Sequence, residues 1–211
     1  MCITFAGEQA MNVLGISGSP RERGNSHILL EHALAPFGDA GWAVRLLRVR
    51  DLAVAPCIAC DHCRTHASTC SLHDDMSLFY DAFRWCDALL VASPVYSRNI
   101  CAQLMAVLDR HRAVNVERPL AGKPGGAIAV GAGEGGGQAI TVAAIYNWLH
   151  SCGAIGVPGE LNGLTARAAA QGEVLGQANR LRQAGVLGSN VLGIATRLHS
   201  EQAHQPDAPE R

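Results

Sequence analysis

Residues 13–26 read VLGISGSPRERGNS, a short apolar run that breaks into a polar, glycine-containing loop and then enters a helical pattern. A strand, a glycine-rich turn and a helix in that order form the setting that a phosphate-binding loop requires. The loop offers hydroxyl, amide and guanidinium groups beside the free N–H groups of a helix start, which together suit a phosphate monoester. These side chains are Ser17, Ser19, Arg21, Asn25 and Ser26. The stretch therefore predicts a phosphate site at the first turn between strand and helix.

Two common nucleotide-binding loops do not match this stretch. A Walker A loop needs Gly-Lys followed by Ser or Thr, and the loop has no lysine. The glycines at positions 15, 18 and 24 do not fit the dinucleotide spacing G-x-G-x-x-G. The loop therefore favours a mononucleotide, and a plain polar connection with an N-cap at Asn25 or Ser26 stays open as the alternative.

The alternation of strand and helix continues along the chain. Apolar runs predict four more strands at 43–49, 88–92, 127–130 and 154–158, with helices between them. Residues 166–198 predict one or two further helices, broken near Gly185 or Gly188. This order demands right-handed crossovers and predicts an α/β fold with a doubly wound parallel sheet. The imperfect alternation of residues 43–49 predicts a strand near a sheet edge.

Length and composition limit the classes of protein to consider. The chain has 211 residues, 48% of them hydrophobic, and a net charge of -1 with no basic run. We expect one domain at residues 11–199, after an N-terminal extension at 1–10 and before a flexible tail at 200–211. The charge excludes binding to nucleic acid or to an anionic membrane surface. Since no apolar run reaches about 20 residues and no signal sequence is present, we expect a cytoplasmic protein.

Two further loops of unusual composition follow predicted strands. Residues 93–97, Ser-Pro-Val-Tyr-Ser, end the third strand, and the glycine-rich residues 131–137 end the fourth. In a doubly wound sheet the ligand binds outside the carboxyl ends of the strands. These two loops and the first one are therefore expected to meet at one edge of the sheet.

Four cysteines form the most specific chemical signal in the chain. They follow the pattern Cys57-x2-Cys60-x2-Cys63-x6-Cys70 within a loop at residues 51–73 that has no sustained periodicity. Three thiolates at this spacing on a curling backbone can reach three corners of a cubane, and the longer arm can return with the fourth. The pattern therefore predicts a 4Fe-4S cluster.

Two other interpretations of the cysteine loop stay open. Zinc could take the four thiolates or recruit a histidine, although zinc sites usually come as two separated C-x2-C pairs. The available histidines are His62, His66 and His73. The cysteines could also hold no metal.

The chain resembles the flavodoxin-like NAD(P)H-dependent FMN reductase family, and within it the iron-sulfur flavoproteins. The resemblance rests on residues 15–20 and 24–26, the cysteines with Asp74-Asp75-Met76, residues 93–96, 102–104 and 108–110. It implies a five-stranded sheet of order 2-1-3-4-5 and bound FMN. Where glycine is expected between the first two cysteines, Ala59 stands, so the φ angle there decides whether the turn is strained.

The resemblance also implies which residues contact FMN. The first loop would hold the phosphate, residues 94–97 would lie along the ribityl chain and the isoalloxazine ring, and residues 131–137 would approach the pyrimidine edge. The implied FMN contacts are Ser17, Ser19, Pro20, Arg21, Asn25, Ser26, Pro94, Val95, Tyr96, Ser97, Gly131, Gly133, Glu134 and Gly135. Glycine loops supply the backbone N–H groups that stabilise a reduced flavin.

By this resemblance the chain is an FMN-dependent oxidoreductase that moves electrons between a reduced donor and a small-molecule acceptor. The implied donor is ferredoxin or NAD(P)H, and the implied assembly is a homodimer or homotetramer, which would let the cluster face the flavin of a neighbouring subunit. No catalytic side chain is expected, because the cofactors carry the chemistry.

Two other functions stay open from the sequence. The first is a cluster-free NAD(P)H:FMN or quinone reductase. The second is a flavodoxin-like electron carrier without a substrate of its own, against which the near-zero net charge argues.

Overall fold

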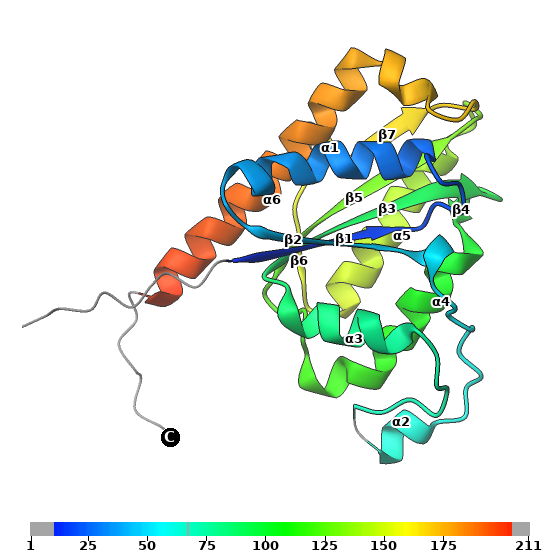
Figure 1. Cartoon of the computed structure of the whole chain (residues 1–211), viewed down its shortest axis with the longest axis vertical. Coiled ribbons are helices and arrows are strands. Elements are labelled where there is room, and N and C mark those ends of the chain that lie inside the picture. The colour runs from blue at the N-terminus through cyan, green and yellow to red at the C-terminus, as the bar shows by residue number, and fades with distance from the viewer. Residues whose placement is uncertain (1–10, 67, 204–211) are drawn as a thin grey trace, which may run out of the picture.

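The computed structural model describes residues 11–66 and 68–203, which form a parallel sheet covered by helices on both faces (Figure 1). The main strands are β1 (Asn12–Ser17), β2 (Ala43–Arg48), β3 (Ala88–Tyr96), β5 (Pro124–Gly131) and β6 (Ile155–Gly156). They are hydrogen-bonded in the order β2-β1-β3-β5-β6. Counted along the chain, this is the predicted order 2-1-3-4-5, with β2 at an edge, so the expected fold is confirmed.

Two short strands were not predicted. The first, β4 (Asn99–Ile100), pairs antiparallel with the end of β3. The second, β7 (Leu164–Arg167), runs parallel to the carboxyl half of β5, whereas β6 pairs with its first two residues. The fifth place in the sheet is therefore shared by β6 and β7, and residues 166–167 are strand where a helical region was expected to begin.

The helices alternate with the strands as predicted. The α-helices are α1 (Asn25–Asp39), α2 (His62–Thr65), α3 (Met76–Trp85), α4 (Ala102–Arg110), α5 (Gly137–Ser151) and α6 (Ala178–Ala203). The 3-10 helices are η1 (Val49–Asp51), η2 (His111–Glu117) and η3 (Glu173–Gly176).

Both faces of the sheet are buried, because successive side chains of β3 point to opposite sides. Leu90 belongs to the core beneath α1 and α6, whereas Leu89 and Val91 belong to the core beneath α3, α4 and α5. Figure 1 shows these two helical layers on either side of the strands. Burial on both sides is the reason that β3 has a continuous apolar sequence.

The predicted break near Gly185 or Gly188 is wrong, because α6 is one continuous helix. A Cβ atom at Gly188 would lie 1.9 Å from the carbonyl oxygen of Ala33, so this glycine lets α6 approach α1 closely. The helix also continues past residue 199, where we expected the domain to end. The expected N-terminal extension and residues 204–211 of the tail lie outside the described residues.

Candidate functional site

Two serine hydroxyls lie at the start of the candidate phosphate site. Ser17 ends β1 and Ser26 lies in the first turn of α1, and they are 1% and 2% exposed. Neither Oγ has a hydrogen-bond partner among the described residues. The first N–H groups of α1 also have no acceptor within the helix. These donors fit a phosphate monoester, which would satisfy buried hydroxyls that are otherwise costly to leave unpaired.

The other polar side chains of this loop are already bonded to protein. Ser19 Oγ accepts a hydrogen bond from the backbone N–H of Arg21 at 3.2 Å, and Arg21 Nη1 donates to the carbonyl of Ala169 at 3.2 Å. Asn25 donates through Nδ2 to the carbonyl of Ala170 at 2.7 Å and accepts from the N–H of Val174 at 3.3 Å. The side chain of Asn25 therefore joins α1 to the segment after β7, a contact that the sequence did not reveal.

A cavity opens beside this loop at the carboxyl ends of β1, β3 and β5. It is lined by Ser19, Arg21, Gly24, Asn25, Ser26, Pro94, Val95, Tyr96, Val130, Gly131, Ala132, Ala168 and Ala169. The structure thus brings together residues from all three predicted loops. Six predicted contacts are not among the lining residues: Ser17, Pro20, Ser97, Gly133, Glu134 and Gly135.

A tight hairpin between β3 and β4 forms one wall of this cavity. Ser97 and Arg98 both have positive φ angles, of 47° and 65°, as a two-residue type I′ turn demands. The hairpin packs on the glycine loop so closely that a Cβ atom at Gly137 would lie 2.8 Å from Val95 Cγ1. Gln138 Nε2 donates to the carbonyl of Gly133 at 2.8 Å, which orders the loop from within. The glycines therefore serve close packing as well as access to a ligand.

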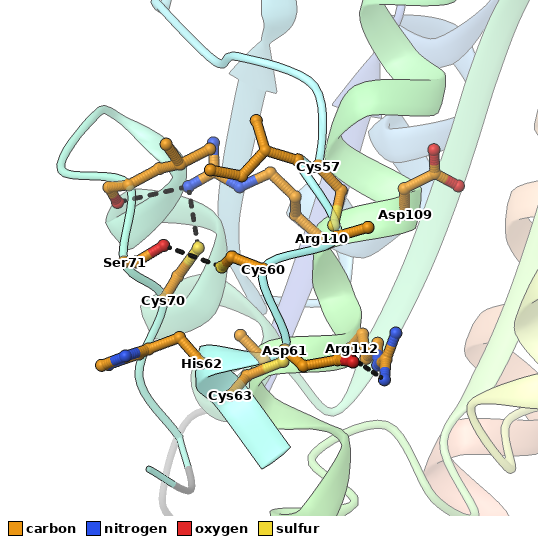
Figure 2. A pocket seen from close by; sticks show the side chains of 14 residues that line it. Cys57, Cys60, Asp61, His62, Cys63, Cys70, Ser71, Asp109, Arg110 and Arg112 are labelled. Atoms are coloured by element: carbon orange, nitrogen blue, oxygen red, sulfur yellow. Dashed lines mark hydrogen bonds and ion pairs between the residues drawn. The ribbon is translucent and has the colours of Figure 1, made fainter. Parts of the chain in front are cut away.

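The four predicted cysteines line one second cavity (Figure 2). Cys57 and Cys60 are exposed, whereas Cys63 and Cys70 are half-buried. Apolar side chains from the loop and from η2 complete much of the wall; these are Ile58, Leu72 and Ala113. Among the residues that the structure describes, no three His, Cys, Asp or Glu side chains are grouped closely enough to hold a single metal ion. The thiols instead surround a space.

Backbone conformation explains how the cysteine loop curls. Ala59 has a φ angle of 51° and Asp61 one of 55°, both in the left-handed region that glycine favours. Alanine in this conformation costs on the order of 1 kcal/mol, so the strain expected at Ala59 is present. Of the three histidines considered as alternative ligands, His62 lines the cavity, while His66 and His73 do not.

The base of the cysteine loop is closed by reciprocal hydrogen bonds. The N–H of Ala53 donates to the Asp75 carboxylate at 2.7 Å, and the N–H of Asp75 donates to the carbonyl of Ala53 at 3.1 Å. The N–H of Ala55 donates to the Asp74 carboxylate at 2.9 Å. The residues between Ala55 and Asp74 therefore leave and return to the domain at nearly one place.

Sequence reasoning assigned no role to Arg110, which lies at the end of α4 and is 2% exposed. It forms an ion pair with Asp74 beneath the cysteine loop. Burial acts to raise the pKa of Asp74, but hydrogen bonds from Arg110, Ala55 and Met76 outweigh it and hold that pKa below its usual value. The only signal in the sequence was the position of Arg110 in the matched stretch 108–110.

Comparison with known proteins finds relatives for most of the chain. A family model described as NADPH-dependent FMN reductase matches residues 11–165. The chain is 36% identical over 148 residues to an iron-sulfur flavoprotein of Methanocaldococcus jannaschii, which covers 69% of this chain and 76% of the relative. It is 37% identical over 146 residues to an iron-sulfur flavoprotein of Methanosarcina thermophila, with coverage of 69% and 76%.

A solved structure gives the same picture of the fold. The flavodoxin, WrbA-like protein of Agrobacterium tumefaciens matches with a TM-score of 0.62 at 14% identity, covering 90% of this chain and 99% of its own. At this identity the likeness concerns the fold alone, which is flavodoxin-like. No helix in the described part of the chain is both long and apolar enough to cross a membrane.

Proposed function

Because this chain belongs to the NADPH-dependent FMN reductase family and is an FMN-dependent oxidoreductase, we propose that it carries a second redox group, a 4Fe-4S cluster. The ligands are Cys57, Cys60, Cys63 and Cys70. The protein moves electrons between a reduced donor, ferredoxin or NAD(P)H, and a small-molecule acceptor. When bound, FMN exchanges electrons in pairs and the cluster exchanges them singly.

The observation that carries this proposal is the cavity lined by all four cysteines of one loop. A zinc ion needs four ligand atoms within about 2.3 Å of one centre, whereas a cubane takes one thiolate at each of four separate irons. Thiols that surround a space suit the second arrangement. The names of the relatives, iron-sulfur flavoproteins, support the same assignment.

The chain's own residues bind and orient the flavin in the other cavity. Ser26 lines this cavity and holds the phosphate together with the N-terminus of α1, since its Oγ has no partner among the described residues. We also assign the unpaired Oγ of Ser17, at the end of β1, to the phosphate, although Ser17 is not among the residues that line the cavity. Arg21 lies on the rim, where its guanidinium can exchange the carbonyl of Ala169 for a phosphate oxygen. The flavin ring lies along Pro94, Val95 and Tyr96, while Ser97, the remaining member of that stretch, shapes the hairpin.

The glycine loop approaches the pyrimidine edge of the flavin. Gly131 lines the cavity at the end of β5, and a Cβ atom there would lie 3.2 Å from Val95 Cβ in the β3–β4 hairpin. Glu134 forms an exposed ion pair with Arg167 at 3.5 Å and so holds the outer part of the loop. We assign Gly133 and Gly135 to that outer part, beyond the cavity wall.

The family resemblance also supports a cytoplasmic homodimer or homotetramer as the working form. In such an assembly the cysteine cavity of one subunit would face the flavin of another. The two candidate cavities have no lining residue in common.

Anaerobic purification followed by a visible spectrum and assays of iron and acid-labile sulfide tests the proposal. About four irons per chain together with flavin absorbance are expected. Flavin without iron or sulfide, even after reconstitution, would instead favour the cluster-free NAD(P)H:FMN or quinone reductase. Steady-state oxidation of NAD(P)H by the purified protein then separates a reductase from an electron carrier, which consumes none on its own.

A further inference from the structure

The guanidinium of Arg110 connects the two arms of the cysteine loop. Nη1 donates to the carbonyl of Ala55 at 3.0 Å, on the arm that leads into Cys57. Nη2 donates to the carbonyl of Leu72 at 3.4 Å and to the sulfur of Cys70 at 3.5 Å, on the returning arm. Figure 2 shows Arg110 reaching from α4 to the loop, with dashed lines to Cys70 and to the returning arm. One side chain therefore sets the separation of the arms that carry the first and the last cysteine.

The positive charge of Arg110 is buried beside these thiols. Its counter-charge is Asp74, whose oxygens also accept hydrogen bonds from the N–H groups of Ala55 and Met76. The Nε atom is buried without a partner among the described residues, and Arg110 lines the cysteine cavity. The guanidinium group therefore brings a buried positive charge to the wall of the cavity.

The other charged and titratable groups nearby are arranged differently. Arg112 also lines the cavity, but its side chain is 50% exposed and pairs with Asp61 at 2.9 Å. Asp109 lines the cavity as well, and the hydroxyl of Tyr80 donates to the backbone carbonyl of Arg110 at 3.2 Å. Among the lining arginines of the described chain, Arg110 is the one screened from solvent.

We propose that Arg110 is a positioning and charge-compensating residue for the cluster, which fixes the Cys70 thiolate and raises the reduction potential of the bound group. The inference rests on the proposed function, because it requires a cluster on the four cysteines. Each added electron makes a thiolate-bound cluster more negative, so a nearby buried cation favours the reduced form. A hydrogen bond to the ligand sulfur acts in the same direction.

Redox titration of the holoprotein, followed by electron paramagnetic resonance, tests this role. Arg110→Gln is expected to lower the ratio of reduced to oxidised cluster about tenfold at a fixed potential, a shift of about 59 mV for one electron. Asp74→Asn keeps an acceptor for the backbone but removes the counter-charge, so the potential is expected to rise. Two shifts of opposite sign are not what loss of packing would produce.

Arg112→Gln is the matched control, since it removes the same charge from the same cavity wall at a solvent-exposed position. Its shift is expected to be less than a third of that in Arg110→Gln. If Arg110→Gln does not retain iron, the potentials of Asp74→Asn and Arg110→Lys decide. Arg110→Lys keeps the positive charge, so its potential is expected to stay close to that of the wild type.

The outcomes separate this inference from the function on which it rests. A wild-type cluster whose potential is unchanged in Arg110→Gln, or lowered in Asp74→Asn, overturns the role of Arg110 and leaves the proposed function intact. Absence of iron and sulfide from the wild type overturns both.

Discussion

Asn25 Nδ2 lies 2.7 Å from the carbonyl oxygen of Ala170, and this hydrogen bond joins the start of α1 to the segment that follows β7. The second end of the amide accepts from the N–H of Val174 at 3.3 Å. The flavin cavity therefore has a wall from the C-terminal part of the chain, and that wall is held by a residue of the phosphate loop.

Asn25→Ala is expected to lower the affinities for FMN and for riboflavin by the same factor. The substitution frees the cavity wall at Ala168–Ala170, and it removes no contact with the phosphate. Loss of one partly buried and one buried hydrogen bond should also lower the free energy of unfolding by about 1–2 kcal/mol. Isothermal titration with both ligands and urea unfolding measure the two effects. His32→Ala, at an exposed position of the same helix, is the control. A loss confined to FMN would return Asn25 to the phosphate site.

Ser26→Ala is expected to show the opposite pattern. Its buried Oγ has no partner among the described residues, so the flavin-free protein should unfold with an unchanged or slightly higher free energy. The affinity for FMN should fall about 5- to 10-fold while that for riboflavin stays constant. Ser19→Ala is the contrast, because Ser19 Oγ already accepts from the Arg21 N–H and its loss should cost stability. Equal losses for FMN and riboflavin in Ser26→Ala would contradict a phosphate contact.

Cys60→Ser is expected to remove most of the iron and sulfide while FMN stays bound. The reason is that the cysteine cavity and the flavin cavity have no lining residue in common. Iron analysis and the flavin spectrum of the same anaerobic sample provide the measurement. Cys152→Ala changes a buried cysteine outside the cavity and should keep its iron. Full iron content in Cys60→Ser would rule out the ligand assignment.

The protein is expected to lose stability between about pH 6.5 and 4 through His111. Burial lowers the pKa of this imidazole to about 4, so the folded protein holds it neutral while the unfolded chain protonates near 6.5. Stability present above pH 6.5 is therefore lost as the pH falls, by up to about 3 kcal/mol at pH 4.

His111→Phe should reduce the dependence of stability on pH, because phenylalanine does not titrate. Its ring also suits the contacts with Phe83 and Trp148, whose ring centroids lie 5.2 and 5.7 Å from that of His111. Urea unfolding of both proteins at pH 7, 5.5 and 4.5 tests this. The difference between the two curves isolates His111 from the carboxylates that also titrate in acid. Parallel curves would show that the imidazole has no part in the acid sensitivity.

The centre of the sheet could be predicted from sequence because β1, β3 and β5 are long and largely buried. The four-residue β7 escaped prediction, since only Leu164 and Ala166 of it are buried and its place depends on pairing with β5. Gly188 was misread for a related reason. A glycine that ends a helix and one that admits a neighbouring helix look alike until the neighbour, here Ala33, is known.

Some residues of the candidate sites could be predicted from sequence and others could not. Spacing alone placed the four cysteines together, because they all lie in one loop, at residues 51–73. Asn25 and Arg110 were not understood from sequence, since their partners lie 145 and 40 residues away and leave no local pattern. The contact between Arg21 and the phosphate remains a prediction. The hydrogen bond from Arg21 to the carbonyl of Ala169 joins two residues that line the cavity.

The closure at Ala53 and Asp75 has a consequence for how such a chain can change over time. A loop that begins and ends at one hydrogen-bonded point can be lengthened, shortened or replaced without altering the register of β1 and β2 or the course of α3. The segment that carries the four cysteines can in this sense be deleted as a unit. A descendant that lost it would keep the cavity proposed to bind the flavin. One-cofactor and two-cofactor proteins can therefore stand a single deletion apart.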